Sequence, residues 1–172
     1  HAHIDHSGRI PLLIKSGYAK HIYTQRATRD LCRIMLKDSG HLQEKDAEWE
    51  NRKRERKGLR KVEALYTVAD AQAAMRYFRA MEYGVEQRIA PGVWLRLHDA
   101  GHILGSAIAE LRVQDDHGER VLVFSGDLGH SGAPILRDPA LVRRADLVVM
   151  ESTYGDRCHR SWASTWDELR GV

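Results

Sequence analysis

The spacing of apolar residues changes once along this 172-residue chain, and that change limits the folds it can adopt. Before Pro91-Gly92, apolar residues recur at intervals of three and four, as on one face of a helix. After it, Val93, Leu95 and Leu97 alternate with other residues, as in a strand. A chain that is rich in helices first and in strands later predicts the α/β class, with helices layered on a sheet.

The first half is expected to hold short elements before one longer helix. A short helix is predicted over 9–15 and a short strand over 21–24. A longer helical pattern begins at Arg26 and is expected to stop at Gly40. Further on, Thr67-Val-Ala-Asp70 has the pattern of a capping box and predicts a helix whose spaced apolar residues reach Phe78.

The segment 41–61 is strongly charged, with a basic centre at 51–57. Cations of this kind can neutralise the phosphates of an RNA backbone. A charge run is more often a solvated helix face, and Glu55 interrupts this one. Both interpretations stay open at this point.

The second half predicts a sheet. Strands are expected over 107–113 and 121–125, with a turn at 115–118 between them. The apolar run Leu147–Met150 is typical of a strand covered on both faces. A last helix is predicted over 161–170.

Composition narrows the class of protein only slightly. Hydrophobic residues make up 42% and charged residues 30%, and no apolar run is long enough to span a membrane. Two cysteines make no disulfide framework and favour a cytoplasmic location. The net charge of +3 slightly favours anionic partners. Oligomerisation is left open, with a homo-oligomer as one possibility.

The chain opens on a dense set of metal-ligand side chains, His1-Ala-His3-Ile-Asp5-His6. Alternate residues of an extended segment point the same way, so His1 and His3 can reach one ion together. Asp5 and His6 come one step later and can face a second ion. Imidazole and carboxylate are ligands that zinc takes. The alternative is a histidine-rich turn or tag remnant, but a tag would rarely include the aspartate.

Two later motifs each place a ligand-type side chain next to glycines. Ala100-Gly-His102-Ile-Leu-Gly-Ser106 precedes a predicted strand, and Phe124-Ser-Gly-Asp127-Leu-Gly129 follows one. Their glycines let the backbone come close to an ion. Taken together with the opening string, these motifs resemble the metallo-β-lactamase superfamily. The resemblance implies two zinc ions: the first held by His1, His3 and His102, the second by Asp5 and His6, with Asp127 bridging them.

The string Glu151-Ser-Thr-Tyr-Gly155 resembles the entry to the β-CASP branch of that superfamily, which consists mostly of RNA-processing nucleases. The branch includes the cleavage and polyadenylation endonuclease and bacterial relatives. The resemblance implies RNA as substrate, catalytic roles for Asp5 and Glu151, and a substrate contact for His159. In the family the acidic residue at Glu151 partners a histidine from later in the chain. The local alternative is a strand-end glutamate that caps the next turn.

The resemblance also bears on how complete the chain is. We expect residues 1–160 to be part of a metallo-β-lactamase domain that lacks its first strands, and 161–172 to begin a truncated β-CASP region. We therefore expect the 172-residue piece alone to be inactive, and targeting cannot be judged from it. Two other functions stay open: a thioester or lactam hydrolase on the same fold, and a non-catalytic RNA-processing scaffold. The sequence does not separate endonuclease from exonuclease.

Overall fold

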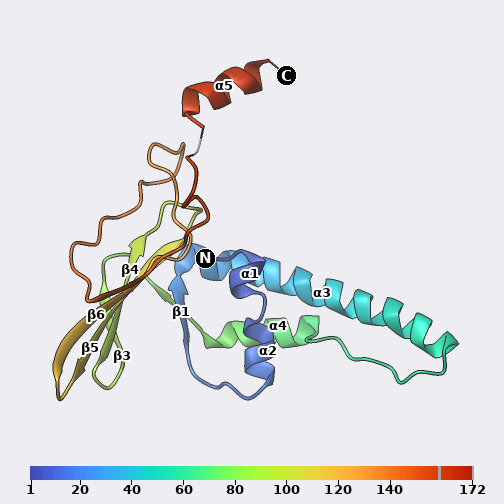
Figure 1. Cartoon of the computed structure of the whole chain (residues 1–172). Coiled ribbons are helices and arrows are strands. Elements are labelled where there is room, and N and C mark those ends of the chain that lie inside the picture. Colours follow the sequence, from blue (N-terminus) through green and yellow to red (C-terminus); the bar gives the residue numbers. More distant parts are fainter. Residues whose placement is uncertain (159, 172) are drawn as a thin grey trace.

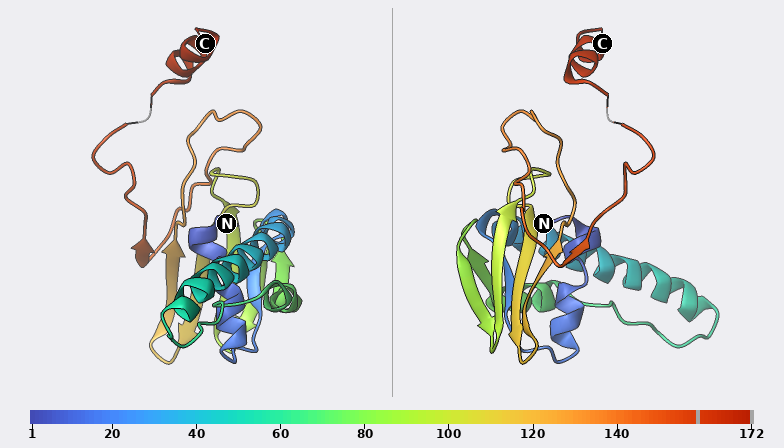
Figure 2. Two further views of the ribbon diagram at one scale, coloured as in Figure 1. Left: turned by 90° about the vertical axis from the view of Figure 1, so that its right-hand side faces the viewer. Right: turned by 60° about the vertical axis from the view of Figure 1, so that its left-hand side comes forward.

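The structure, a computed structural model, describes residues 1–158 and 160–171 and contains two β-sheets with helices beside them. Helices fill most of the first half, and the five strands of the larger sheet all follow α4, which confirms the predicted α/β class (Figure 1). Both views of Figure 2 place the helices of the first half on one side of the larger sheet. Among the described residues, no helix is both long enough and apolar enough to cross a membrane.

The larger sheet has five strands arranged in chain order, β3 (Glu86–Ala90), β4 (Val93–Asp99), β5 (Ala107–Asp115), β6 (Gly118–Phe124) and β7 (Leu147–Val149). Adjacent strands of this sheet are antiparallel, except β6 and β7, which run parallel to each other. The predicted alternation in β4 is confirmed, because Leu95 and Leu97 are both buried. The strand β3 carries little apolar signal, since four of its five residues are exposed, and the sequence did not predict it.

The smaller sheet pairs β1 (Ile22–Gln25) with β2 (Phe78–Met81) in parallel. The strand β2 corrects the prediction of a helix that reaches Phe78. The helix α4 (Val68–Ala74) ends earlier and is followed by a 3-10 turn at Met75–Tyr77. Phe78 then pairs with Ile22 across the sheet, so pairing with a distant strand overrides the local helical spacing. The capping box that begins α4 is confirmed on both of its hydrogen bonds.

The helix α3 (Arg26–Arg56) corrects the expected stop at Gly40, because it runs 31 residues and includes most of the charged segment. Gly40 is buried in the middle of the helix. A β-carbon there would lie 2.9 Å from the carbonyl oxygen of Thr67. Glycine at this position therefore serves a close approach of the chain before α4, and not a helix end.

Before α3, the chain forms two short helices, α1 (Ile4–Ser7) and α2 (Ile10–Lys15). Ala2, directly before α1, packs on α3 in a core cluster that includes Cys32, Leu36 and Tyr66, and α1 itself also contacts α3. This cluster fixes the opening metal-ligand string against the long helix. Both cysteines are free, Cys32 buried and Cys158 exposed, and the cytoplasmic location stays a prediction.

The end of the chain departs from one prediction and confirms another. Leu147, Val148 and Val149 of β7 are each about half exposed, so the expectation of a strand covered on both faces is wrong for this structure. Within the described part of the chain, the strand lies at the edge of the sheet and pairs only with β6. The helix α5 (Trp162–Arg170) is confirmed, with the Ser161 side chain at its N-cap. The division of domains near residue 160 stays a prediction.

Candidate metal centre

The opening string lies partly before and partly within the helix α1. His3 has an extended conformation (φ −55°, ψ 147°) and stands directly before α1, so His1 and His3 precede the helix while Asp5 and His6 belong to it. The ring centroids of His1 and His3 lie 4.5 Å apart. Those of His1 and His6 lie 4.2 Å apart. Both halves of the string therefore face one small volume.

Two loops from the larger sheet bring the remaining ligand-type residues to the same place. His102 comes from the loop between β4 and β5, and Asp127 follows β6. One ligand atom from each of His1, His3, His102 and Asp127 can be chosen so that all four lie within 4.8 Å of one another. Segments about 100 residues apart in the chain thus converge on one cluster.

The carboxylate of Asp127 is the common point of this cluster. Its Oδ2 atom lies 3.6 Å from Nε2 of His1, 3.3 Å from Nε2 of His6 and 3.7 Å from Nε2 of His102. On the far side, Nε2 of His6 lies 3.6 Å from Oδ2 of Asp5. Asp127 therefore lies within 4 Å of histidines from both the start of the chain and the His102 loop.

Two nitrogen atoms in the cluster are buried without a hydrogen-bond partner, Nε2 of His1 and Nε2 of His102. The His1 side chain is only 1% exposed. Leaving a buried ring nitrogen unpaired costs free energy, so native structures rarely keep one without a reason. Imidazole nitrogen and carboxylate oxygen are the donor types that zinc prefers, and the residues present fit that ion.

The loops that carry His102 and Asp127 press against each other through glycine. The amide N–H of Gly129 donates to the carbonyl oxygen of Ala100 over 2.8 Å. A β-carbon on Gly129 would overlap the backbone of Gly101. Gly101 itself has φ +66°, where an L side chain is strained. Gly129 of the second motif and Gly101 of the first therefore serve the contact between the two loops.

Buried hydroxyl groups hold the ligand-bearing segments, and sequence reasoning missed them. The four buried polar residues of the described chain are Ser7, Thr28, Ser106 and Ser125. Ser7 donates to the carbonyl oxygens of Ala2 and His3, both over 3.0 Å. The hydroxyl oxygen of Ser106 accepts from the N–H of His102 over 3.0 Å. The signal was present in the sequence, because each of these serines stands inside or next to a motif string.

The other two hydroxyls act on the same loops. Thr28 of α3 donates to the carbonyl oxygen of Gly105 over 2.6 Å, which attaches the His102 loop to the start of the long helix. Ser125 donates to the carbonyl oxygen of Gly126 over 2.6 Å and accepts from the N–H of Glu151 over 3.1 Å. All the buried polar side chains thus orient the segments around the cluster.

Glu151 lies beside this cluster but is not among its converging ligand atoms. Its Oε1 accepts a hydrogen bond over 2.5 Å from the N–H of Leu128, the residue directly after Asp127. Hydrogen bonds from Thr153 and from Leu128 lower the pKa of this carboxyl below its usual range. Glu151 is therefore an anion at neutral pH and fixes the backbone next to Asp127.

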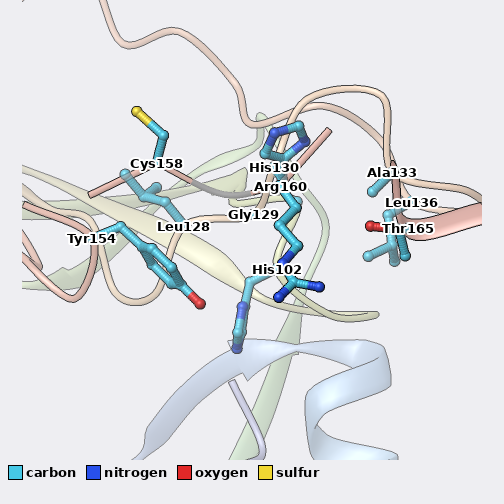
Figure 3. Close-up of a pocket in the computed structure, with 11 residues that line it drawn as sticks. His102, Leu128, Gly129, His130, Ala133, Leu136, Tyr154, Cys158, Arg160 and Thr165 are labelled. Carbon is cyan, nitrogen blue, oxygen red and sulfur yellow. The ribbon is translucent and has the colours of Figure 1, made fainter. Parts of the chain in front are cut away.

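A cavity of about 620 Å³ opens beside His102. Its wall includes Leu128, Tyr154, Cys158 and Arg160, so the loop after β7 faces the cluster across it (Figure 3). The predicted substrate contact His159 lies outside the described residues. Cys158 and Arg160 both line the cavity together with His102.

Comparisons with known proteins give relatives but no family model that matches the chain. A ribonuclease of Thermus thermophilus is 37% identical over 169 residues, which is 98% of this chain and 34% of that protein. A transcription termination factor, FttA, of Methanocaldococcus jannaschii is 35% identical over 157 residues, 90% of this chain and 22% of that protein. The factor of the same name from Methanococcus maripaludis is 34% identical over 157 residues. The chain thus spans about a third of the ribonuclease and about a fifth of the termination factors, and it is similar to one part of each.

Proposed function

We propose that this chain belongs to a zinc-dependent ribonuclease of the β-CASP branch of the metallo-β-lactamase superfamily. The observation that carries the proposal is Asp127, whose Oδ2 lies 3.3–3.7 Å from three histidine nitrogens, two of them buried and unpaired. The similarity to a ribonuclease over 98% of the chain favours RNA over a thioester or lactam as the substrate.

The donor set divides into two groups around Asp127. His1, His3 and His102 would hold one zinc ion, and Asp5 and His6 the other, with Asp127 shared. When bound, such a pair of ions polarises a phosphate and activates water for attack on it. The buried hydroxyls of Ser7 and Ser106 would keep the ligand segments in place as the charge at the centre changes.

Glu151 has a role that follows from its ionisation. Because its pKa is lowered, it cannot by itself donate a proton to a leaving oxygen near neutral pH. It can accept a hydrogen bond from a protonated histidine and orient it. This agrees with the role that the family resemblance implies, in which a later histidine is the general acid and Glu151 its partner.

The cavity beside His102 is the proposed place for the RNA next to the scissile bond. Tyr154 offers an aromatic ring and a hydroxyl, and Arg160 offers a cation, although Arg160 also pairs with Glu168 over 2.5 Å. An aromatic ring with a nearby cation suits a base and its phosphate.

The test uses the full-length protein with Asp127→Ala and the matched control Asp116→Ala in the exposed turn before β6. Elemental analysis should give two zinc ions for the parent and the control and fewer for Asp127→Ala. RNA cleavage should be lost in Asp127→Ala and after dialysis against a chelator, and zinc should restore the dialysed parent. Full RNA cleavage by Asp127→Ala would sink the proposal. Turnover of thioesters or lactams without RNA cleavage would point to the small-molecule hydrolase, and a folded protein without zinc to the scaffold.

A further inference from the structure

The long helix α3 carries an unbroken row of exposed cationic and aromatic side chains that the proposed zinc centre does not use. The row is defined by a step of four residues, and we call it the α3 ridge. It consists of Arg33, Lys37, His41, Lys45, Trp49 and Lys53, all of them exposed.

Helix geometry makes these residues neighbours. Side chains four positions apart lie next to each other on a helix surface. At 1.5 Å per residue the ridge is about 30 Å long, and each step turns it by about 40° around the axis. It is therefore a continuous track that winds slowly around α3.

The ridge begins one residue after Cys32, which is buried in the core cluster that holds Ala2. The buried residues of α3 are also spaced by four: Thr28, Cys32, Leu36 and Gly40. The ridge residues Arg33, Lys37 and His41 each directly follow one of these buried residues in the sequence. Cys32 packs in the same cluster as Ala2, and Thr28 holds the His102 loop. Packing thus fixes one end of the ridge beside the ligand string, while the other end lies on the part of α3 that extends away from the sheets (Figure 1).

The far end is a rigid and strongly basic hairpin, which we call the α3 tip (residues 51–61). It holds seven basic residues and one acidic residue, a net charge of +6 in a chain whose total is +3. Asn51 and Val62 exchange two hydrogen bonds, of 2.8 and 2.7 Å, which close the hairpin. The N–H of Leu59 donates to the carbonyl oxygen of Arg54 over 2.9 Å, and Gly58 turns the chain at φ +65°.

Most of these cations have no carboxylate partner. Within the described chain, the ion pairs of the ridge and tip are Lys45 with Glu48 at 3.0 Å and Arg54 with Glu50 at 3.6 Å. Lys53 instead lies 3.0 Å from the ring centroid of Trp49, whose side chain is 56% exposed. A helix face shaped only for solvation would alternate the signs of its charges, since like charges four apart destabilise a helix. Arg33 and Lys37 are such a like-charged pair.

We propose that the α3 ridge and tip bind the sugar–phosphate backbone of RNA that extends from the metal centre, with Trp49 stacking on a base. The cations and the exposed aromatic ring together favour a nucleic acid as the ligand. An acidic protein surface would pair with the cations, but it has no bases to stack on Trp49. The location beside the catalytic centre rests on the proposed function, whereas the binding of RNA by the arm can be measured without it.

The test measures binding of full-length protein to a fluorescent single-stranded RNA over a range of salt, in a chelator so that no cleavage occurs. The tip variant carries Arg52→Gln, Lys53→Gln, Arg56→Gln and Lys57→Gln. The control variant removes the same charge at exposed sites elsewhere, with Lys20→Gln, Arg88→Gln, Arg120→Gln and Arg143→Gln. If all four tip cations contact phosphates, the slope of log K against log salt should become shallower by about 3. The control should keep the parent's slope.

A second variant separates stacking from charge. Trp49→Leu should weaken RNA binding by roughly tenfold while it keeps the salt slope, because stacking releases no counterions. Thermal melting of each variant verifies folding. An unchanged slope and affinity in the tip variant, or an equal loss in the control, would overturn the proposal and leave an acidic protein as the ligand for these cations. Cleavage is assayed separately with zinc. A parent that binds through the tip but never cleaves RNA would refute the proposed function alone.

Discussion

Replacing Gly40 with alanine measures how closely the chain before α4 packs on α3. In an exposed helix interior this change would stabilise the helix by about 1 kcal/mol, because glycine has the greater backbone freedom when unfolded. Gly40 is not exposed. An added β-carbon would lie 2.9 Å from the carbonyl oxygen of Thr67, and 3.0 Å from its carbonyl carbon and from the amide nitrogen of Val68.

All three of these neighbours are backbone atoms that cannot rotate away. Thr67 is also fixed by the capping box, in which its N–H donates to Asp70 over 2.9 Å and its hydroxyl accepts from the Asp70 N–H over 3.1 Å. Relief of the clash must therefore move the start of α4. Overpacking of this kind costs roughly 1–3 kcal/mol, so after the gain of about 1 kcal/mol in helix propensity the net loss should be about 0–2 kcal/mol.

The assay is thermal and denaturant unfolding of the full-length protein with Gly40→Ala and with Asp46→Ala, an exposed position on the same helix. A net loss of about 0–2 kcal/mol corresponds to a Tm lowered by up to roughly 8 °C for a domain of this size. Asp46→Ala should leave the Tm equal or raise it slightly, because only propensity changes. A Tm for Gly40→Ala above that of the parent would show that the approach of α4 to α3 is looser than the structure has it.

Three further predictions concern the elements around the site. Ser106→Ala should lower zinc affinity about 10- to 100-fold, because the N–H groups of His102 and Ile103 lose their acceptor. Competition with a chelator measures the zinc affinity. The control Ser131→Ala should leave that affinity unchanged. Thr67→Ala should cost about 1 kcal/mol of unfolding free energy through loss of the cap; an unaltered Tm would contradict it. The pKa of Asp70 is lowered below 3.8, mainly by the hydrogen bond from the Thr67 N–H, so its stabilisation is present above that pH and is lost as the pH falls through the lowered pKa. Unfolding of the parent and of Asp70→Asn should therefore converge in acid, and a constant difference between them would refute the assignment.

Local patterns in the sequence predicted the elements that depend only on neighbouring residues. The alternation in Val93, Leu95 and Leu97 gave a strand, and the capping box at Thr67 gave the start of a helix. The opening string supplied imidazole and carboxylate side chains to the candidate site, since the donor chemistry belongs to each side chain by itself. That His1 and His3 would face the same way also followed from their spacing.

Other features depend on contacts between distant segments, and the sequence alone misread or missed them. Gly40 looked like a helix end because its reason, the backbone of Thr67, lies 27 residues away. Phe78 fitted a helical spacing, but its pairing with Ile22 makes it the start of a strand. The strand β3 had no pattern of its own, and its partner β4 determines it.

The candidate site shows the same division. The sequence by itself determined that histidines and aspartates of the right kind stand in three motifs, because residue type and local spacing are properties of the chain. The tertiary structure alone decided that Asp127 becomes their common point, that Ser7, Ser106 and Ser125 are the buried hydroxyls behind them, and that the charged stretch of α3 projects as a rigid arm. Those outcomes depend on which segments fold against each other, and packing between segments far apart in the sequence leaves no periodic signal in either of them.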